Sequence, residues 1–283
     1  MRALPVIAIA ALALLGAAPP PQSPSPVAPK RVVSLNMCAD QLLVALADPG
    51  QIVALTEWAR DPELSSVAVQ ARAFAFTHRT AEEVMALHPD LVIGAPFRTK
   101  AVLAPLKANG VRMVELPRGE GVEGIAASIT TIADAVGHPE RGRAMIAGMH
   151  RDLARIGPPP GRGRVAAYYQ RNGFLTGTGT RVDDMMQRVG LVNLAGKLGR
   201  PALSRLSLEE MALARPDFLV MDSGVRDVAD RGTAALHHPI LDAAVPPSRR
   251  FYIPQSLTVC GTPGFAKAVA MLAAQVRAAD RAR

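Results

Sequence analysis

Short runs of β-branched and aliphatic residues alternate along most of this chain with longer stretches that are apolar on one helical face. The runs predict strands at residues 31–35, 52–55, 91–93, 112–115, 164–168, 218–221 and 250–253. The longer stretches predict helices at residues 40–47, 81–87, 100–109, 122–136, 139–156, 182–189, 208–214 and 264–279. Strands that alternate with helices are typical of βαβ units, in which neighbouring strands run parallel. The pattern therefore indicates an α/β protein with parallel sheets.

The alternation is interrupted at residues 157–161, a Gly-Pro-Pro-Pro-Gly segment that ends the preceding helix. The same alternation starts again after it. We therefore expect two Rossmann-like lobes joined by a single long helix, with a ligand cleft between the lobes. The predicted boundaries are residues 30–137 for the N-terminal lobe, 138–157 for the linking helix and 158–283 for the C-terminal lobe.

A distant internal repeat supports the division into two lobes. Residues 80–93 align without a gap against residues 207–220, and both copies place two glutamates in the first turn of a helix and Pro-Asp just before a strand. Acidic residues there suit the positive end of the helix dipole, so helix capping alone explains their presence. Capping does not by itself explain why the same pair recurs in both halves.

The N-terminus predicts export. Arg2 precedes an apolar stretch at residues 3–15, which is shorter than the roughly 20 residues that a membrane helix requires, and small residues follow. We expect a cleavable signal peptide at residues 1–18, a Pro-rich leader at residues 19–29 and a soluble periplasmic protein. No cysteine lies near the expected cleavage site to accept a lipid.

Composition and the lack of catalytic motifs in the sequence argue against nucleic-acid binding, catalysis and a metal site. The formal net charge is +8, yet the 32 Lys and Arg are scattered without a basic run, which argues against a nucleic-acid partner. No nucleophile elbow or zinc-protease helix occurs, and the adjacent His237 and His238 would diverge on a helix or strand. We therefore expect no catalytic residues, no metal site and no cofactor, although a bound ligand could itself carry cobalt or iron.

Ligand-binding residues are expected in the loops that follow the strands, because ligands of open α/β sheets bind beyond the carboxyl ends of the strands. Aromatic and arginine side chains in such loops suit a large, flat or anionic chelate. The predicted ligand-binding residues are Asn36, Cys38, Trp58, Phe97, Arg98, Tyr169, Arg171, Arg226 and Cys260.

The two cysteines, Cys38 and Cys260, both fall in these loops, in opposite lobes. In an oxidising compartment they could form a disulfide across the cleft, which would restrict its opening. Two free, buried thiols are equally compatible with the sequence.

At the opening strand, at the Glu-x-x-x-x-Leu-x-Pro-Asp-Leu-Val element of residues 82–92 and at its second copy, the sequence resembles the iron–siderophore and cobalamin periplasmic-binding family. The resemblance implies two lobes, a rigid linking helix and capture of a metal chelate, cobalamin or a ferric siderophore. It also implies delivery to an ABC permease dimer with its ATPase at the inner membrane. One glutamate per lobe docks on the permease in that family, and the matching residues here are Glu82 and Glu209. Their neighbours Glu83 and Glu210 are the alternatives.

Two other functions remain open. A haem receptor on the same scaffold would need an axial ligand in the cleft, for which Tyr168, Tyr169 and His78 are candidates. An exported α/β hydrolase would need a nucleophile and a base that we cannot assign. We expect a monomer and not an enzyme.

Overall fold

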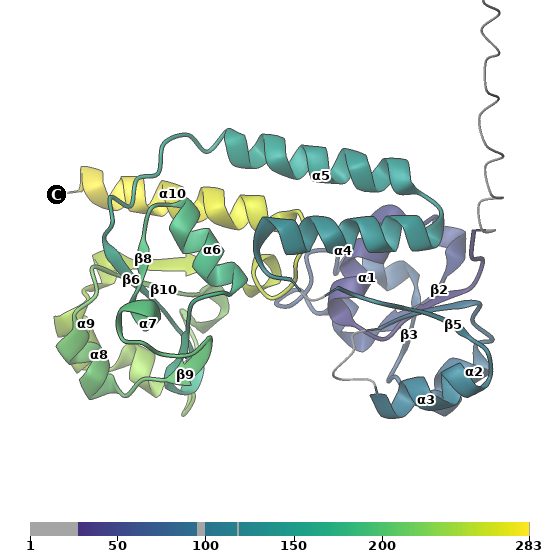
Figure 1. Ribbon diagram of the computed structural model, residues 1–283. Helices are drawn as coiled ribbons and strands as arrows, with labels where there is room; N and C mark the ends of the chain where they lie inside the picture. Colours follow the sequence, from purple (N-terminus) through teal and green to yellow (C-terminus); the bar gives the residue numbers. More distant parts are fainter. Residues whose placement is uncertain (1–27, 95–99, 118, 283) are drawn as a thin grey trace, which may run out of the picture.

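The computed structural model describes residues 28–94, 100–117 and 119–282, which form two α/β lobes (Figure 1). The expected signal peptide at residues 1–18 and all but the last two residues of the expected leader lie outside the described residues. Within the described ranges, no helix combines the length and the apolar character needed to cross a membrane.

The first lobe contains a five-stranded, fully parallel sheet of order β3-β2-β1-β4-β5. Its strands are β1 (Val32–Ser34), β2 (Ile52–Thr56), β3 (Ala75–Thr77), β4 (Leu91–Gly94) and β5 (Arg112–Glu115). Its helices are α1 (Met37–Leu46), α2 (Ala81–Ala86), α3 (Lys100–Ala108) and α4 (Gly121–Val136). The strand order reverses between β1 and β4, and in such sheets the ligand crevice lies at that reversal.

The second lobe contains a six-stranded sheet of order β11-β10-β6-β7-β9, with β8 also paired to β6. Its strands are β6 (Val165–Tyr169), β7 (Phe174–Thr176), β8 (Val192–Asn193), β9 (Leu203–Arg205), β10 (Phe218–Asp222) and β11 (Arg250–Ile253). Its helices are α6 (Arg181–Arg188), α7 (Leu194–Lys197), α8 (Leu208–Ala214), α9 (Pro239–Ala244) and α10 (Gly264–Arg281).

The α/β class and the two lobes are confirmed, but the second sheet is mixed and not parallel throughout. Strand β7 runs antiparallel to both β6 and β9. Only residues 170–173 connect β6 to β7, and a connection this short can form a hairpin but cannot cross over to a parallel neighbour.

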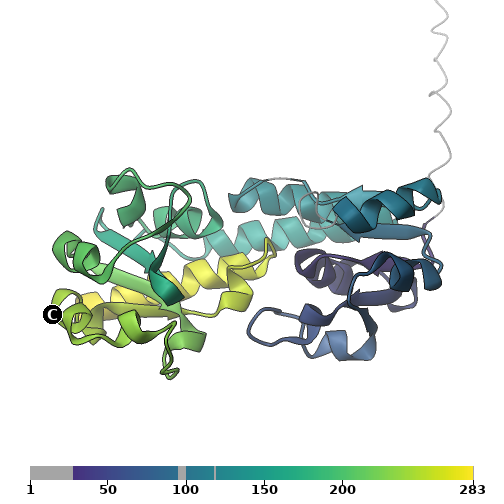
Figure 2. The same ribbon diagram turned by 90° about the horizontal axis from the view of Figure 1, so that it is seen from below.

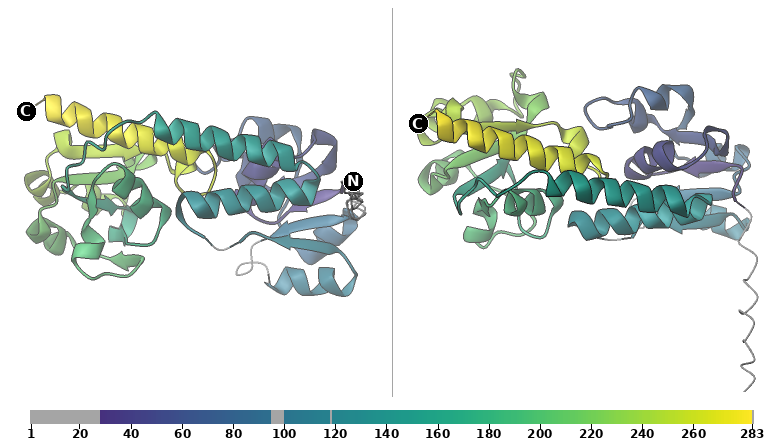
Figure 3. Two further views of the ribbon diagram at one scale, coloured as in Figure 1. Left: turned by 45° about the horizontal axis from the view of Figure 1, so that its top comes forward. Right: turned by 90° about the horizontal axis from the view of Figure 1, so that it is seen from above.

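Helix α5 (Pro139–Ala154) connects the lobes and packs against both α4 and α10 (Figures 1 and 3). One continuous apolar core runs beneath these helices and includes Leu43 and Ile129 of the first lobe with Met185 and Phe265 of the second. Because α5 is a continuous helix, it has no loop residues that could absorb a wide hinge rotation. The shared core adds to this restraint, so we expect only small movements of the lobes. The exact lobe boundaries stay a prediction.

The internal repeat has a structural role in both lobes. The carboxylate of Asp90 accepts hydrogen bonds from the backbone N–H groups of Lys30 and Arg31, just before β1. Asp217, its counterpart, accepts from the N–H of Val165 at the start of β6. Each copy therefore ties the end of one helix to the beginning of the central strand of its lobe.

Candidate functional site

A cavity of about 390 Å³ lies where β1 and β2 end, at the junction of the two lobes. A volume near 400 Å³ falls within the range of about 300–1,000 Å³ that small-molecule pockets usually have. Most of its wall belongs to the first lobe, and the second lobe adds one residue from the segment between β11 and α10. The described lining residues are Asn36, Met37, Cys38, Trp58, Leu64 and Val259.

Two local interactions fix the wall on the side of the first lobe. Asn36 is the N-cap of α1, and its Oδ1 accepts hydrogen bonds from the N–H groups of Cys38 and Ala39 at 2.9 and 3.2 Å. The guanidinium of Arg79 stacks on the Trp58 ring at 3.5 Å from its centroid. Glu57 holds Arg79 in turn, with an Nη2–Oε1 distance of 2.9 Å. Trp58 is thus held in place by a charged neighbour.

The loop between β2 and β3 extends from the first lobe toward the second (Figure 2). Gln41 of α1 anchors this loop, because its Nε2 donates to the carbonyl of Leu64 and its Oε1 accepts from Ser66. Glu63 in the same loop approaches Gly224 of the second lobe so closely that a Cβ on Gly224 would lie 2.5 Å from Glu63 Oε2. The lobes therefore meet at this rim as well.

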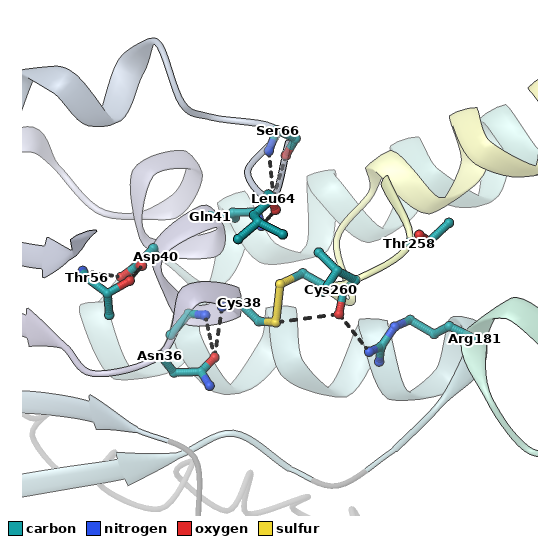
Figure 4. Close-up of a disulfide and its surroundings, with 12 residues drawn as sticks. Asn36, Cys38, Asp40, Gln41, Thr56, Leu64, Ser66, Arg181, Thr258 and Cys260 are labelled. Carbon is teal, nitrogen blue, oxygen red and sulfur yellow. Dashed lines mark hydrogen bonds between the residues drawn. A yellow bond between two sulfur atoms is a disulfide. The ribbon is translucent and has the colours of Figure 1, made fainter. Parts of the chain in front are cut away.

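Cys38 and Cys260 form a disulfide beside the cavity (Figure 4). Close to it, Arg181 of α6 donates from Nη2 to the carbonyl of Val259 at 3.2 Å. The Nη1 of Arg181 lies 2.9 Å from Oε2 of Glu120 in the first lobe. One covalent bond and one ion pair thus connect the lobes near the cavity.

A buried carboxylate lies one helical turn after the Asn36 cap. Asp40 is fully buried and accepts hydrogen bonds from the hydroxyl of Thr56 at 2.5 Å and from its N–H at 3.2 Å. Burial raises the pKa of Asp40 to about 6, and these hydrogen bonds offset only part of the effect.

The raised pKa of Asp40 predicts a pH-dependent stability. Burial favours the protonated form of Asp40 in the folded state. The contribution of Asp40 to the free energy of unfolding is therefore present near pH 4 and is lost as the pH rises through about 6. A shift from 3.8 to about 6 corresponds to about 3 kcal/mol. Between pH 4 and pH 8, we expect the free energy of unfolding of the wild type to fall by about this amount relative to Asp40→Asn, measured by urea unfolding. Parallel pH profiles for the two proteins would contradict the prediction.

Tyr169 is a core residue and does not line the cavity, which corrects the sequence-based expectation. Its side chain is 1% exposed, and its hydroxyl donates to the carbonyl of Leu206 at 2.9 Å. Strand β6 begins and ends one residue later than the sequence pattern indicated, so Tyr169 belongs to the strand and not to the loop. Tyr168 is also buried, and burial raises its pKa to about 12 although Thr258 hydrogen-bonds its side chain.

The other predicted ligand residues fall into different places. Arg171 is exposed, and its Nη2 lies 2.6 Å from Oδ2 of Asp230. Arg226 is also exposed, and its guanidinium stacks on the ring of Tyr252. Neither arginine belongs to the described lining of the cavity. Phe97 and Arg98 lie outside the described residues.

Three lining residues were not predicted as ligand contacts. Met37, the first residue of α1, and Val259, in the segment after β11, lie beside the two cysteines, so their place along the chain could have identified them. Leu64 has no such signal, because it lies in an irregular loop.

The four glutamates of the repeat separate into two kinds. Glu83 accepts hydrogen bonds from the Thr77 hydroxyl and from His78, which lowers its pKa to about 2. Glu210 accepts from the Ser207 N–H and from Arg200, and these bonds lower its pKa too.

The other member of each pair faces solvent. Glu82 and Glu209 are exposed and have no hydrogen-bond or ion-pair partner in the described part of the chain. Each copy of the repeat therefore presents one solvent-facing carboxylate at the start of a helix.

The sequence matches the family model described as periplasmic binding protein over residues 32–238. A curated relative, the "Cobalamin-binding protein" of Halobacterium salinarum (strain ATCC 29341 / DSM 671 / R1), is 22% identical over 215 residues, which is 75% of this chain. The match spans 58% of the length of that relative.

Solved structures share the fold. The apo form of the periplasmic heme-binding protein RhuT from Roseiflexus sp. RS-1 superimposes with a TM-score of 0.70 at 22% identity, covering 88% of this chain and 98% of that one. The periplasmic vitamin B12 binding protein BtuF of Vibrio cholerae gives a TM-score of 0.69 at 17% identity, and the match covers 89% of this chain and 98% of that one.

Proposed function

Because the chain belongs to the periplasmic binding protein family, we propose that it captures a metal chelate between its two lobes and delivers the chelate to an ABC permease. The family consists of solute-binding proteins, so the expectation that the chain is not an enzyme is confirmed. Relatives and structural neighbours are named for cobalamin and for haem, and the choice of ligand rests on the chemistry of the cleft.

The cavity at the lobe junction is the observation that carries this proposal. Its wall combines an immobilised aromatic ring, Trp58, with the aliphatic side chains of Leu64 and Val259 and the amide of Asn36. A largely apolar wall with one polar group suits contact with the organic part of a chelate. We favour a chelate whose metal is already fully coordinated, cobalamin or a ferric siderophore, because such a ligand needs contact area and no additional metal ligand.

The exposed carboxylates supply the second part of the proposal. Glu82 lies in the first turn of α2, which follows β3, and Glu209 lies in the first turn of α8, which follows β9. Two separated charges on a rigid body can orient the protein on a cationic surface of the permease, while each exposed pair contributes only about 0–1 kcal/mol. Such weak contacts allow the protein to dissociate after delivery.

Haem binding is the second candidate, and one observation favours it. Tyr168 and Tyr169 are buried, but the His78 side chain is 66% exposed and its Nδ1 lies 3.1 Å from Oε1 of Glu83. A carboxylate that orients a histidine ring is the usual second partner of a metal-bound imidazole. His78 ranks behind the chelate cavity because it is not part of the described lining.

Absorption spectroscopy with hemin and cyanocobalamin separates these two functions. We expect no Soret band that depends on His78, and we expect cyanocobalamin or a ferric siderophore to bind with 1:1 stoichiometry. A shifted Soret band in the wild type that is lost in His78→Ala would favour a haem receptor and contradict the chelate proposal.

A further inference from the structure

The disulfide joins the two lobes directly at the cavity. Cys38 lies in the first turn of α1 and lines the cavity, whereas Cys260 is fully buried between β11 and α10. The bond connects residues that are 222 positions apart, with a Cα–Cα distance of 5.1 Å. The lobes are therefore held together at the cleft as well as through α5.

Val259 is the lining residue whose place depends on this bond. It is the single contribution of the second lobe to the described lining, and it precedes Cys260 in the chain. Its carbonyl oxygen lies 4.0 Å from Cys38 Sγ. The distance between Val259 and the lining residues of the first lobe is therefore one dimension of the cavity.

The non-covalent contacts at the same place are weaker restraints. The ion pair between Arg181 and Glu120 has one partner that is 48% exposed, so solvent screens it. In the loop between β2 and β3, Glu63 approaches Gly224 of the second lobe, and no hydrogen bond joins these two residues in the described part of the chain. If the lobes move apart, Glu63 and Gly224 can separate, while the disulfide keeps the segments around Cys38 and Cys260 together.

We propose that the Cys38–Cys260 disulfide is a positioning element of the ligand cavity. It holds Val259 against the first lobe before the ligand arrives. The cavity wall therefore loses little conformational entropy when the ligand binds. It also confines separation of the lobes to the rim where Glu63 approaches Gly224. The effect on affinity rests on the function proposed above, whereas the position of Val259 can be measured without a ligand.

The ligand-free test compares the wild type with Cys38→Ala/Cys260→Ala. Trp58 is the single tryptophan and lines the cavity, so quenching of its fluorescence by acrylamide reports on this wall. We expect the lifetime-corrected quenching constant to rise at least twofold and amide exchange at residues 257–261 to accelerate about tenfold. The amides of β10 should keep wild-type protection, which shows that the fold is intact.

Further results decide this test. Reduction of the wild type should reproduce the behaviour of the double variant. Glu120→Gln, which removes the ion pair and keeps the bond, should stay close to the wild type. Unchanged quenching and exchange in the double variant would overturn the proposal, as would two alkylated thiols in protein that was never reduced.

The affinity test uses cyanocobalamin as the probe. We expect its Kd to be about tenfold weaker for the double variant, at a temperature where both proteins are folded. A looser wall with an unchanged Kd would overturn the role of the disulfide in binding. Failure of the wild type to bind cyanocobalamin would count against cobalamin as the ligand, and the ligand-free measurements would still decide whether the disulfide positions Val259.

Discussion

Replacing both Glu82 and Glu209 by lysine is expected to reduce import of the chelate to the level of cells that lack this protein. The two carboxylates are exposed and unpartnered in the described part of the chain, so their reversal changes no internal contact there. In the proposed docking mode, it converts two attractive contacts with a cationic permease surface into repulsive ones, and like charges brought together at an interface suppress binding. Chelate affinity should change less than about twofold.

The measurement is uptake of radiolabelled chelate, together with the Kd of the purified variant. Glu123→Lys is the matched control, because Glu123 is also exposed and lies in the first turn of α4. It should leave uptake unchanged. Reversal of Glu83 should instead lower the free energy of unfolding, since Glu83 holds Thr77 and His78. Normal uptake by the Glu82→Lys/Glu209→Lys variant would count decisively against docking through these residues.

Replacing Trp58 by alanine is expected to weaken chelate binding by about 2 kcal/mol, which is about 30-fold in Kd. Trp58 supplies the largest aromatic surface of the described lining, and Arg79 stacks on its ring. A rigid ring loses little conformational freedom on contact with a ligand, so its removal costs binding energy directly.

Isothermal titration calorimetry measures this effect, and Trp58→Phe provides the control. Phenylalanine keeps an aromatic face, so the Kd of this variant should lie within about fivefold of the wild type. If Trp58→Ala bound the chelate as tightly as the wild type, the cavity would not be the binding site.

The sequence predicted the helices and strands whose limits are set by residues close to them in the chain. The limits of α8 follow from the capping box formed by Ser207 and Glu210 at its start and from Pro216 after its end. The parallel sheet of the first lobe follows from alternating apolar runs and helices. In contrast, β3, β7, β8 and β9 were not predicted, because strands of two or three residues show no periodic pattern of their own. The equally short β1 was predicted because it lies within a longer, mostly apolar run at residues 31–35.

The candidate site was only partly predictable, because its composition depends on contacts between distant segments. Asn36, Cys38 and Trp58 follow strands directly, and topology alone places them near the cleft. Tyr169 was misplaced by a single residue at the end of β6, which moved it from a loop into the core. The sequence left the pairing of the two cysteines open, since no local pattern records which segments of the two lobes meet.

Mass spectrometry of the small molecule that remains bound when the protein is purified from the cells that produce it decides whether this chain carries a metal chelate. We expect one cobalt corrinoid or ferric siderophore per protein chain, and we expect less of that molecule to remain bound to the Trp58→Ala variant. Recovery of haem bound through His78, or of a small ligand that contains no metal, would contradict this expectation.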